Sequence, residues 1–124
     1  MENESLATDV ARILAEHKAL DVVLLDVRET AGWADYFVIG TCTSSAHMKG
    51  LLRHLEEYLA SFHLVPLNKP DPADDQRWLL LDLGTVVVHV MTAEARQFYD
   101  LESLWFKASR VSIGASAPSS GESI

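Results

Sequence analysis

The chain has 124 residues, 48% of them hydrophobic and 23% charged, so it can bury the core of a single domain. Its formal net charge is −8, with 18 acidic and 10 basic residues and no basic run, which argues against naked nucleic acid as a partner and favours a basic protein surface. No stretch approaches the roughly 18 apolar residues of a membrane span, and the amino terminus lacks the pattern of a signal peptide, so we expect no membrane partner.

The first half of the chain predicts two helices and two strands. A first helix is expected to be capped by Ser5 and to carry apolar residues at helical spacing as far as His17. Apolar runs at Asp21–Val27 and Tyr36–Cys42 predict buried strands. A second helix over residues 46–62 is amphipathic, with one apolar stripe formed by Met48, Leu51, Leu52, Leu55, Leu59 and Phe62.

The second half predicts three more strands and a helix. A short strand at Val65 gives way to a loop rich in Pro and Asp, and residues 78–91, WLLLDLGTVVVHVM, form two strands around a turn at Leu83-Gly84. A third helix over residues 93–107 is expected to turn four residues inward: Phe98, Leu101, Leu104 and Trp105.

The order α-β-β-α-β-β-β-α predicts an α/β (α+β) fold, with a mixed sheet of about five strands flanked by helices. We expect a single domain over residues 1–107. Residues 108–124 are rich in Ser, Ala and Gly and are expected to form a disordered tail.

The hairpin of residues 78–91 separates two faces. If Leu81 lies opposite Val86 and Trp78 opposite His89, alternation gives an aliphatic face that must lie under the helices: Leu79, Leu81, Val86, Val88 and Val90. The mixed face consists of Trp78, Leu80, Asp82, Thr85, Val87, His89 and Met91. Its composition is typical of an interface centre, so we expect it to be bare in the monomer and covered by a partner. The alternative is a second core layer under helices, and a slip of one residue would exchange the faces.

Residues 40–45, GTCTSS, join the second strand to the second helix and do not complete a catalytic motif. A Walker-type loop needs more glycines and a Lys before Ser or Thr, and a nucleophile elbow needs Gly on both sides of its Ser. A nucleotidyltransferase needs paired acids to hold magnesium, and no Asp-x-Asp follows Ser45. The ordinary interpretation is that Ser44 or Ser45 caps the helix.

The other candidate residues also predict no chemistry. Cys42 is the single cysteine, which excludes an internal disulfide, fits a reducing cytoplasm and is expected to be a buried thiol. His47 and His54 are seven residues apart, and no Cys/His spacing matches a zinc site. We therefore predict no catalytic residues, no cofactor and no metal.

Three stretches resemble, in order and spacing, the ribosomal silencing factor family, also called Iojap-like: ADYFVIGTCTSSAHMKGL, WLLLDLGTVVVHVM and EARQFYDLESLW. The resemblance spans about residues 6–106. It implies a sheet similar to that of nucleotidyltransferases without their active-site acids. It also implies a non-enzymatic, cytoplasmic protein that binds the large ribosomal subunit through the basic ribosomal protein fourteen. There it would block joining of the small subunit and repress translation when nutrients are short.

On this resemblance the contact surface lies mainly on the strand pair of residues 78–91 and the neighbouring helix. The expected apolar centre is Trp78, Leu80, Val87 and Met91, and the expected polar contacts are Asp82, His89, Glu94 and Tyr99. Two positions depart from the family pattern, because Ala46 stands where most relatives have Arg and Thr85 stands where many have Asp.

Two other functions stay open at this point. One is a nucleotide-binding or nucleotidyltransferase-like enzyme that uses the Gly40–Ser45 turn, and the other is a generic acidic adaptor. The sequence predicts no sequence-specific contact with nucleic acid. It leaves open whether the mixed face also closes a homodimer.

Overall fold

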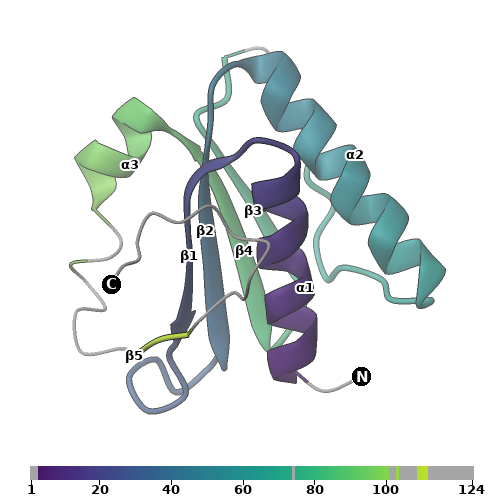
Figure 1. Ribbon diagram of the computed structural model, residues 1–124, viewed down its shortest axis with the longest axis vertical. Coiled ribbons are helices and arrows are strands. Elements are labelled where there is room, and N and C mark those ends of the chain that lie inside the picture. The colour runs from purple at the N-terminus through teal and green to yellow at the C-terminus, as the bar shows by residue number, and fades with distance from the viewer. Residues whose placement is uncertain (1–2, 74, 101–102, 104–108, 112–124) are drawn as a thin grey trace.

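The structure, a computed structural model, describes residues 3–73, 75–100, 103 and 109–111. The elements, in chain order, are α1 (Asn3–Glu16), β1 (Leu20–Asp26), β2 (Tyr36–Cys42), α2 (Ser45–Ser61), β3 (Trp78–Asp82), β4 (Val86–Thr92), α3 (Ala93–Tyr99) and β5 (Ser109–Arg110). The strands form one sheet in the order β3-β4-β2-β1-β5, in which β2 and β4 are parallel and the other neighbours antiparallel. The predicted mixed α/β architecture is confirmed (Figure 1).

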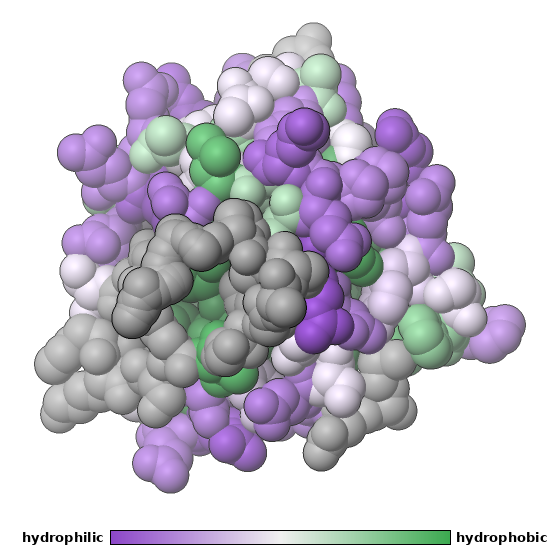
Figure 2. Space-filling view, in the orientation of Figure 1, coloured by the Kyte–Doolittle hydropathy of each residue, from purple (hydrophilic) through white to green (hydrophobic). Residues whose placement is uncertain are grey.

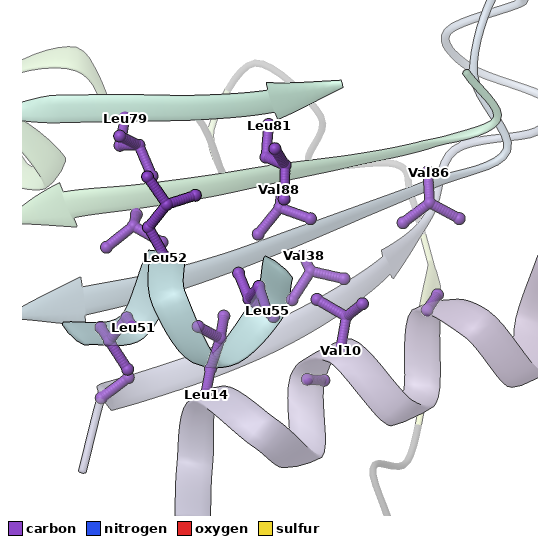
Figure 3. Close-up of a cluster of buried hydrophobic side chains, with 14 of the residues drawn as sticks. Val10, Leu14, Val38, Leu51, Leu52, Leu55, Leu79, Leu81, Val86 and Val88 are labelled. Atoms are coloured by element: carbon purple, nitrogen blue, oxygen red, sulfur yellow. The ribbon is translucent and has the colours of Figure 1, made fainter. Parts of the chain in front are cut away.

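One face of the sheet is buried under α1 and α2. Leu79 and Leu81 of β3 and Val86, Val88 and Val90 of β4 have no exposed surface and share a core with apolar residues of both helices. Figure 3 shows Leu79, Leu81, Val86 and Val88 on the side of the sheet that faces Leu51, Leu52 and Leu55 of α2 and Val10 and Leu14 of α1. The predicted aliphatic face is confirmed, and the outer surface of α2 is mostly hydrophilic (Figure 2).

The opposite face of the sheet is covered in part by α3 and by the connection between β1 and β2. A second, smaller core lies there: Leu25, Val27, Ala34, Phe37, Ile39, Val87, Met91 and Ala95. The two faces therefore alternate along β2, since Val38 belongs to the first core while Phe37 and Ile39 belong to the second.

The register of the β3–β4 hairpin differs from the prediction by two residues. Leu81 pairs with Val88, and the amide of Leu83 donates to the carbonyl of Val86, so that the turn falls at Gly84-Thr85. Gly84 has φ +92°, a backbone conformation that glycine adopts at little cost and that tight hairpin turns use. Because side chains alternate with a period of two, this shift leaves every residue on its predicted face.

The predicted strand at Val65 is not formed. Instead, the amide of Leu67 donates to the carbonyl of Asp82 at 2.8 Å, and the side chain of Asn68 donates to the carbonyl of Leu80 at 2.7 Å. Pro66 has no amide hydrogen, so the segment lies beside β3 without extending the ladder.

The fifth strand of the sheet comes from a different part of the chain. β5 pairs with β1 and lies inside the segment for which a disordered tail was predicted. Residues 112–124 of that segment lie outside the described residues.

Three end positions of helices also differ from the prediction. The described part of α1 begins at Asn3, so Ser5 lies within the helix and does not cap it. Phe62 follows α2 as its C-cap and is 48% exposed, because the helix ends at Ser61. α3 ends at Tyr99, since Asp100 adopts a left-handed conformation, and Phe98 is 80% exposed rather than inward. The other residues predicted to turn inward, Leu101, Leu104 and Trp105, lie outside the described residues.

The core under α2 gives a direct test of this packing. Leu55→Ala removes a fully buried side chain and should lower the free energy of unfolding by about 3 kcal/mol, from lost burial and the cavity left behind. Urea unfolding measures this change. The neighbouring exposed Glu56→Ala should change it by less than about 0.5 kcal/mol. Equal losses in both variants would contradict the assigned helix face.

Candidate partner-binding surface

A groove of about 540 Å³ lies between β3 and α3 on the mixed side of the sheet. It is lined by Gln76, Arg77, Trp78, Glu94, Ala95, Phe98 and Tyr99. The rings of Trp78 and Tyr99 lie 4.8 Å apart, and the ring of Phe98 packs edge-on against Tyr99 at 4.9 Å. Tyr99 is 50% exposed, so the groove presents aromatic surface to solvent. Exposed aromatic side chains in a concave surface are a usual feature of binding sites.

The local sequence places α3 at the edge of this groove. Thr92 ends β4 and caps α3, because its hydroxyl accepts a hydrogen bond from the amide of Ala95 at 3.1 Å. Ala95 is buried in the second core, so α3 packs against the sheet at this residue. Glu94, Phe98 and Tyr99 are exposed on the same short helix and form one wall of the groove.

Trp78 forms the opposite wall and is held by a histidine. The indole Nε1–H of Trp78 donates to Nδ1 of His89 at 3.1 Å, so neutral His89 carries its proton on Nε2. His89 is 4% exposed, and its ring also packs edge-on against Phe37 at 5.1 Å. Nε2 has no hydrogen-bond partner among the described residues. Burial lowers the pKa of His89 to about 4, so it stays neutral and keeps accepting the indole proton at neutral pH.

The predicted contact residues fall into an exposed and a buried group. Leu80 is 39% exposed, Trp78 and Asp82 are half-buried, and Glu94 and Tyr99 are exposed. Val87, His89 and Met91 are buried. The expectation that the whole mixed face is bare is wrong for these three residues, since α3 folds back over the end of β4 and Phe37 packs beside them.

Sequence reasoning missed several residues of the groove. Gln76 and Arg77 lie in the loop predicted after Val65, and Phe98 was expected to point inward. Helical spacing separates neighbouring residues, so it predicted Tyr99 and Phe98 on different faces, whereas the structure places both in the groove wall.

The GTCTSS segment is engaged in starting α2. The hydroxyl of Ser44 accepts from the amide of His47 at 3.0 Å, which confirms the predicted cap. Nδ1 of His47 accepts from the amide of Thr43 at 3.0 Å, and its Nε2 lies 2.8 Å from the carbonyl of His17. Cys42 is buried as predicted, and burial raises the pKa of its thiol.

Two searches of the described residues bear on other kinds of site. No group of three His, Cys, Asp or Glu side chains is placed to hold a metal ion among them. None of their helices has the length and apolar character needed to cross a membrane.

These observations give the class of the protein: it is an α/β protein whose candidate site is an aromatic surface groove. Comparison with known proteins then gives the family. The family model described as "Ribosomal silencing factor during starvation" matches residues 1–123. The chain therefore belongs to the ribosomal silencing factor family, and the resemblance seen in the sequence is confirmed. Its general role is ribosome silencing.

Individual relatives agree with this assignment. Ribosomal silencing factor RsfS of Treponema pallidum is 38% identical over 106 residues, covering 85% of this chain and 94% of that protein. The protein of the same name from Bacillus subtilis is 32% identical over 105 residues, covering 85% and 88%. A crystal structure of a Chromobacterium violaceum protein superposes with a TM-score of 0.78 at 26% identity, covering 86% and 88%. Both relatives are named as silencing factors.

The buried His89 predicts a pH dependence of stability. Its pKa is about 4 in the folded chain against an ordinary 6.5, so the unfolded chain binds the proton first as the pH falls. The contribution of neutral His89 to the free energy of unfolding is therefore fully present above pH 6.5 and is lost as the pH falls toward 4. This loss amounts to about 2 kcal/mol between pH 7 and pH 5. Urea unfolding at both pH values measures it. His89→Gln should remove this component, and parallel losses in both proteins would contradict it.

Proposed function

We propose that the chain is a non-enzymatic steric inhibitor of translation. It binds the large ribosomal subunit through ribosomal protein fourteen, in the cytoplasm, and blocks joining of the small subunit under nutrient limitation. The observation that carries the proposal is the aromatic groove between β3 and α3, which lies on an acidic chain of the ribosomal silencing factor family.

The apolar part of the proposed contact is Trp78, Leu80 and Tyr99. Trp78 and Leu80 stand at alternate positions of β3 and so share one face, and the ring of Tyr99 packs on Trp78. The bond to His89 fixes the indole before a partner arrives, which reduces the entropy lost on binding. Aromatic residues held in this way commonly act as interface anchors.

Val87, His89 and Met91 support the contact from the neighbouring strand. They lie on the same face of the sheet as Trp78 and Leu80 but are buried on β4 beside them, so they act on the shape of the surface rather than touch the partner directly. An interface of ordinary size buries about 1,600 Å² in total, which a surface spanning β3 and α3 can contribute to.

Charge favours a basic partner over the RNA that surrounds it on the ribosome. A net charge of −8 speeds the approach to a basic ribosomal protein and opposes unspecific adhesion to phosphate. Glu94 supplies an acidic group in the groove, and Asp82 supplies one at the other end of β3. Steric inhibition then needs occupancy of the surface and no chemical step.

The enzymatic alternative is disfavoured by the geometry of the Gly40–Ser45 turn. The amide of Thr43 donates to His47, and the hydroxyl of Ser44 accepts from the amide of His47, so two amides that could bind a phosphate are already used. A generic acidic adaptor is distinguished by specificity, because it would show no preference for large subunits over other basic proteins.

The anchor role of Trp78 predicts a large loss of binding. Trp78→Ala should weaken binding to purified large subunits by at least about 30-fold, which corresponds to roughly 2 kcal/mol for an interface anchor. Co-sedimentation with large subunits measures the affinity, and the amount of joined ribosomes in sucrose gradients measures the inhibition.

The matched control is Phe62→Ala, which removes a half-exposed aromatic ring next to α2, on the layer that covers the other face of the sheet. It should bind and inhibit as the original chain does. If Trp78→Ala sediments with large subunits as well as the unchanged chain, the groove is not the contact surface.

The acidic side chains of Asp82 and Glu94 predict a salt-dependent association rate. The double variant Asp82→Asn and Glu94→Gln should slow association with large subunits several-fold at low salt, and the difference should shrink as the salt concentration rises. Asn at position 82 can still accept the hydrogen bond from the amide of Gly84. Stopped-flow measurement compares it with Glu56→Gln and Glu57→Gln on α2. Equal slowing in both double variants would assign the effect to net charge alone.

A further inference from the structure

One row of residues crosses the sheet beneath α3. Leu20 of β1 pairs with Thr41 of β2, Thr41 pairs with Met91 of β4, and Met91 pairs with Trp78 of β3. Thr41 lies on the same face of β2 as Phe37 and Ile39, because strand positions alternate. The row therefore joins Thr41, near the start of the GTCTSS segment, to the tryptophan of the groove.

Arg96 of α3 forms a hydrogen bond at the part of this row that lies away from Trp78. Its Nη1 donates to the hydroxyl of Thr41 at 2.9 Å and lies 3.5 Å from the carbonyl of Leu20. Thr41 is 5% exposed, so the hydroxyl is a buried acceptor for a charged donor. Hydrogen bonds of this kind are stronger than those between neutral groups, and a charged group that loses one under partial burial is costly.

α3 depends on such contacts because it is short. It has seven residues, and helices of this length do not hold together by their own hydrogen bonds in water. Contacts on two sides brace it, since Arg96 reaches β2 and β1 while Tyr99 packs on Trp78 of β3. Ala95 lies buried between these two contacts.

We propose that the Arg96–Thr41 hydrogen bond is a positioning contact that sets the wall of the groove formed by α3. The inference rests on the proposed function, because it concerns how the same groove is held in its binding shape. Without the bond, α3 loses its hydrogen bond to β2, and Tyr99 and Glu94 are held less firmly in position. Thr41, at the end of β2, would then position α3, in addition to lying in the segment that leads into α2.

The test uses the full chain with the substitution Thr41→Val, which replaces the hydroxyl by a methyl group of similar size. Thr41→Ser is the matched control, since it keeps the hydroxyl. Two quantities are measured: hydrogen exchange of the α3 amides in the free chain, and affinity for purified large subunits. Trp78→Ala serves as the reference for loss of the groove contact itself.

We expect Thr41→Val to raise exchange of the α3 amides while β2 and β4 keep their protection, and to weaken large-subunit binding about tenfold, as loss of one hydrogen bond to a charged group implies. Thr41→Ser should keep both the exchange of the α3 amides and the affinity for large subunits at the values of the unchanged chain. If Thr41→Val does not fold, Arg96→Met removes the donor from the partly exposed side and gives the same two readouts.

Three results would overturn parts of the account, and they are distinguishable. Unchanged exchange in α3 overturns the positioning contact, whatever the binding. Faster exchange with unchanged affinity, while Trp78→Ala weakens binding, shows that the bond stabilises α3 without shaping the groove and also overturns it. Unchanged affinity for Trp78→Ala overturns the proposed function, and the exchange measurement still decides whether Arg96 holds α3.

Discussion

The alternation of the β3–β4 hairpin is the constraint on which the rest of the structure depends. Its aliphatic face, typified by Leu79 and Val88, packs with no exposed surface under α1 and α2. Because a strand has only two faces, this burial commits Trp78 and Leu80 to the other side of the sheet. The driving force is ordinary burial of apolar area, and the candidate site is its geometric consequence.

That other side becomes a site because the described residues cover it only in part. α3 buries Met91 and the second core, yet it is two turns long and leaves Trp78 at the edge of an open groove. A longer helix packed along β3 would bury the tryptophan, and a missing helix would expose the second core. The groove thus requires a short helix held in a definite place, and the hydrogen bond from Arg96 to Thr41 supplies such a hold.

The sequence predicted the features that local pattern encodes. The bounds of β2, the buried stripe of α2 and both faces of the hairpin follow from periodicity, and the cap at Ser44 follows from residue type. The mispredictions at the site have nonlocal causes. The burial of Val87, His89 and Met91 depends on α3 folding back across the sheet, and the pairing of β5 with β1 joins segments some 80 residues apart. The missed Arg96–Thr41 bond likewise spans 55 residues, beyond any window of local pattern.

The central claim is that the groove between β3 and α3 is the surface by which this member of the ribosomal silencing factor family contacts the ribosome. A cryo-electron microscopy structure of the large subunit with the chain bound tests it most directly. We expect Trp78 and Tyr99 to face a basic large-subunit protein at the surface where the small subunit docks. A bound chain that turns its α1–α2 layer toward the subunit, with the groove open to solvent, would contradict it.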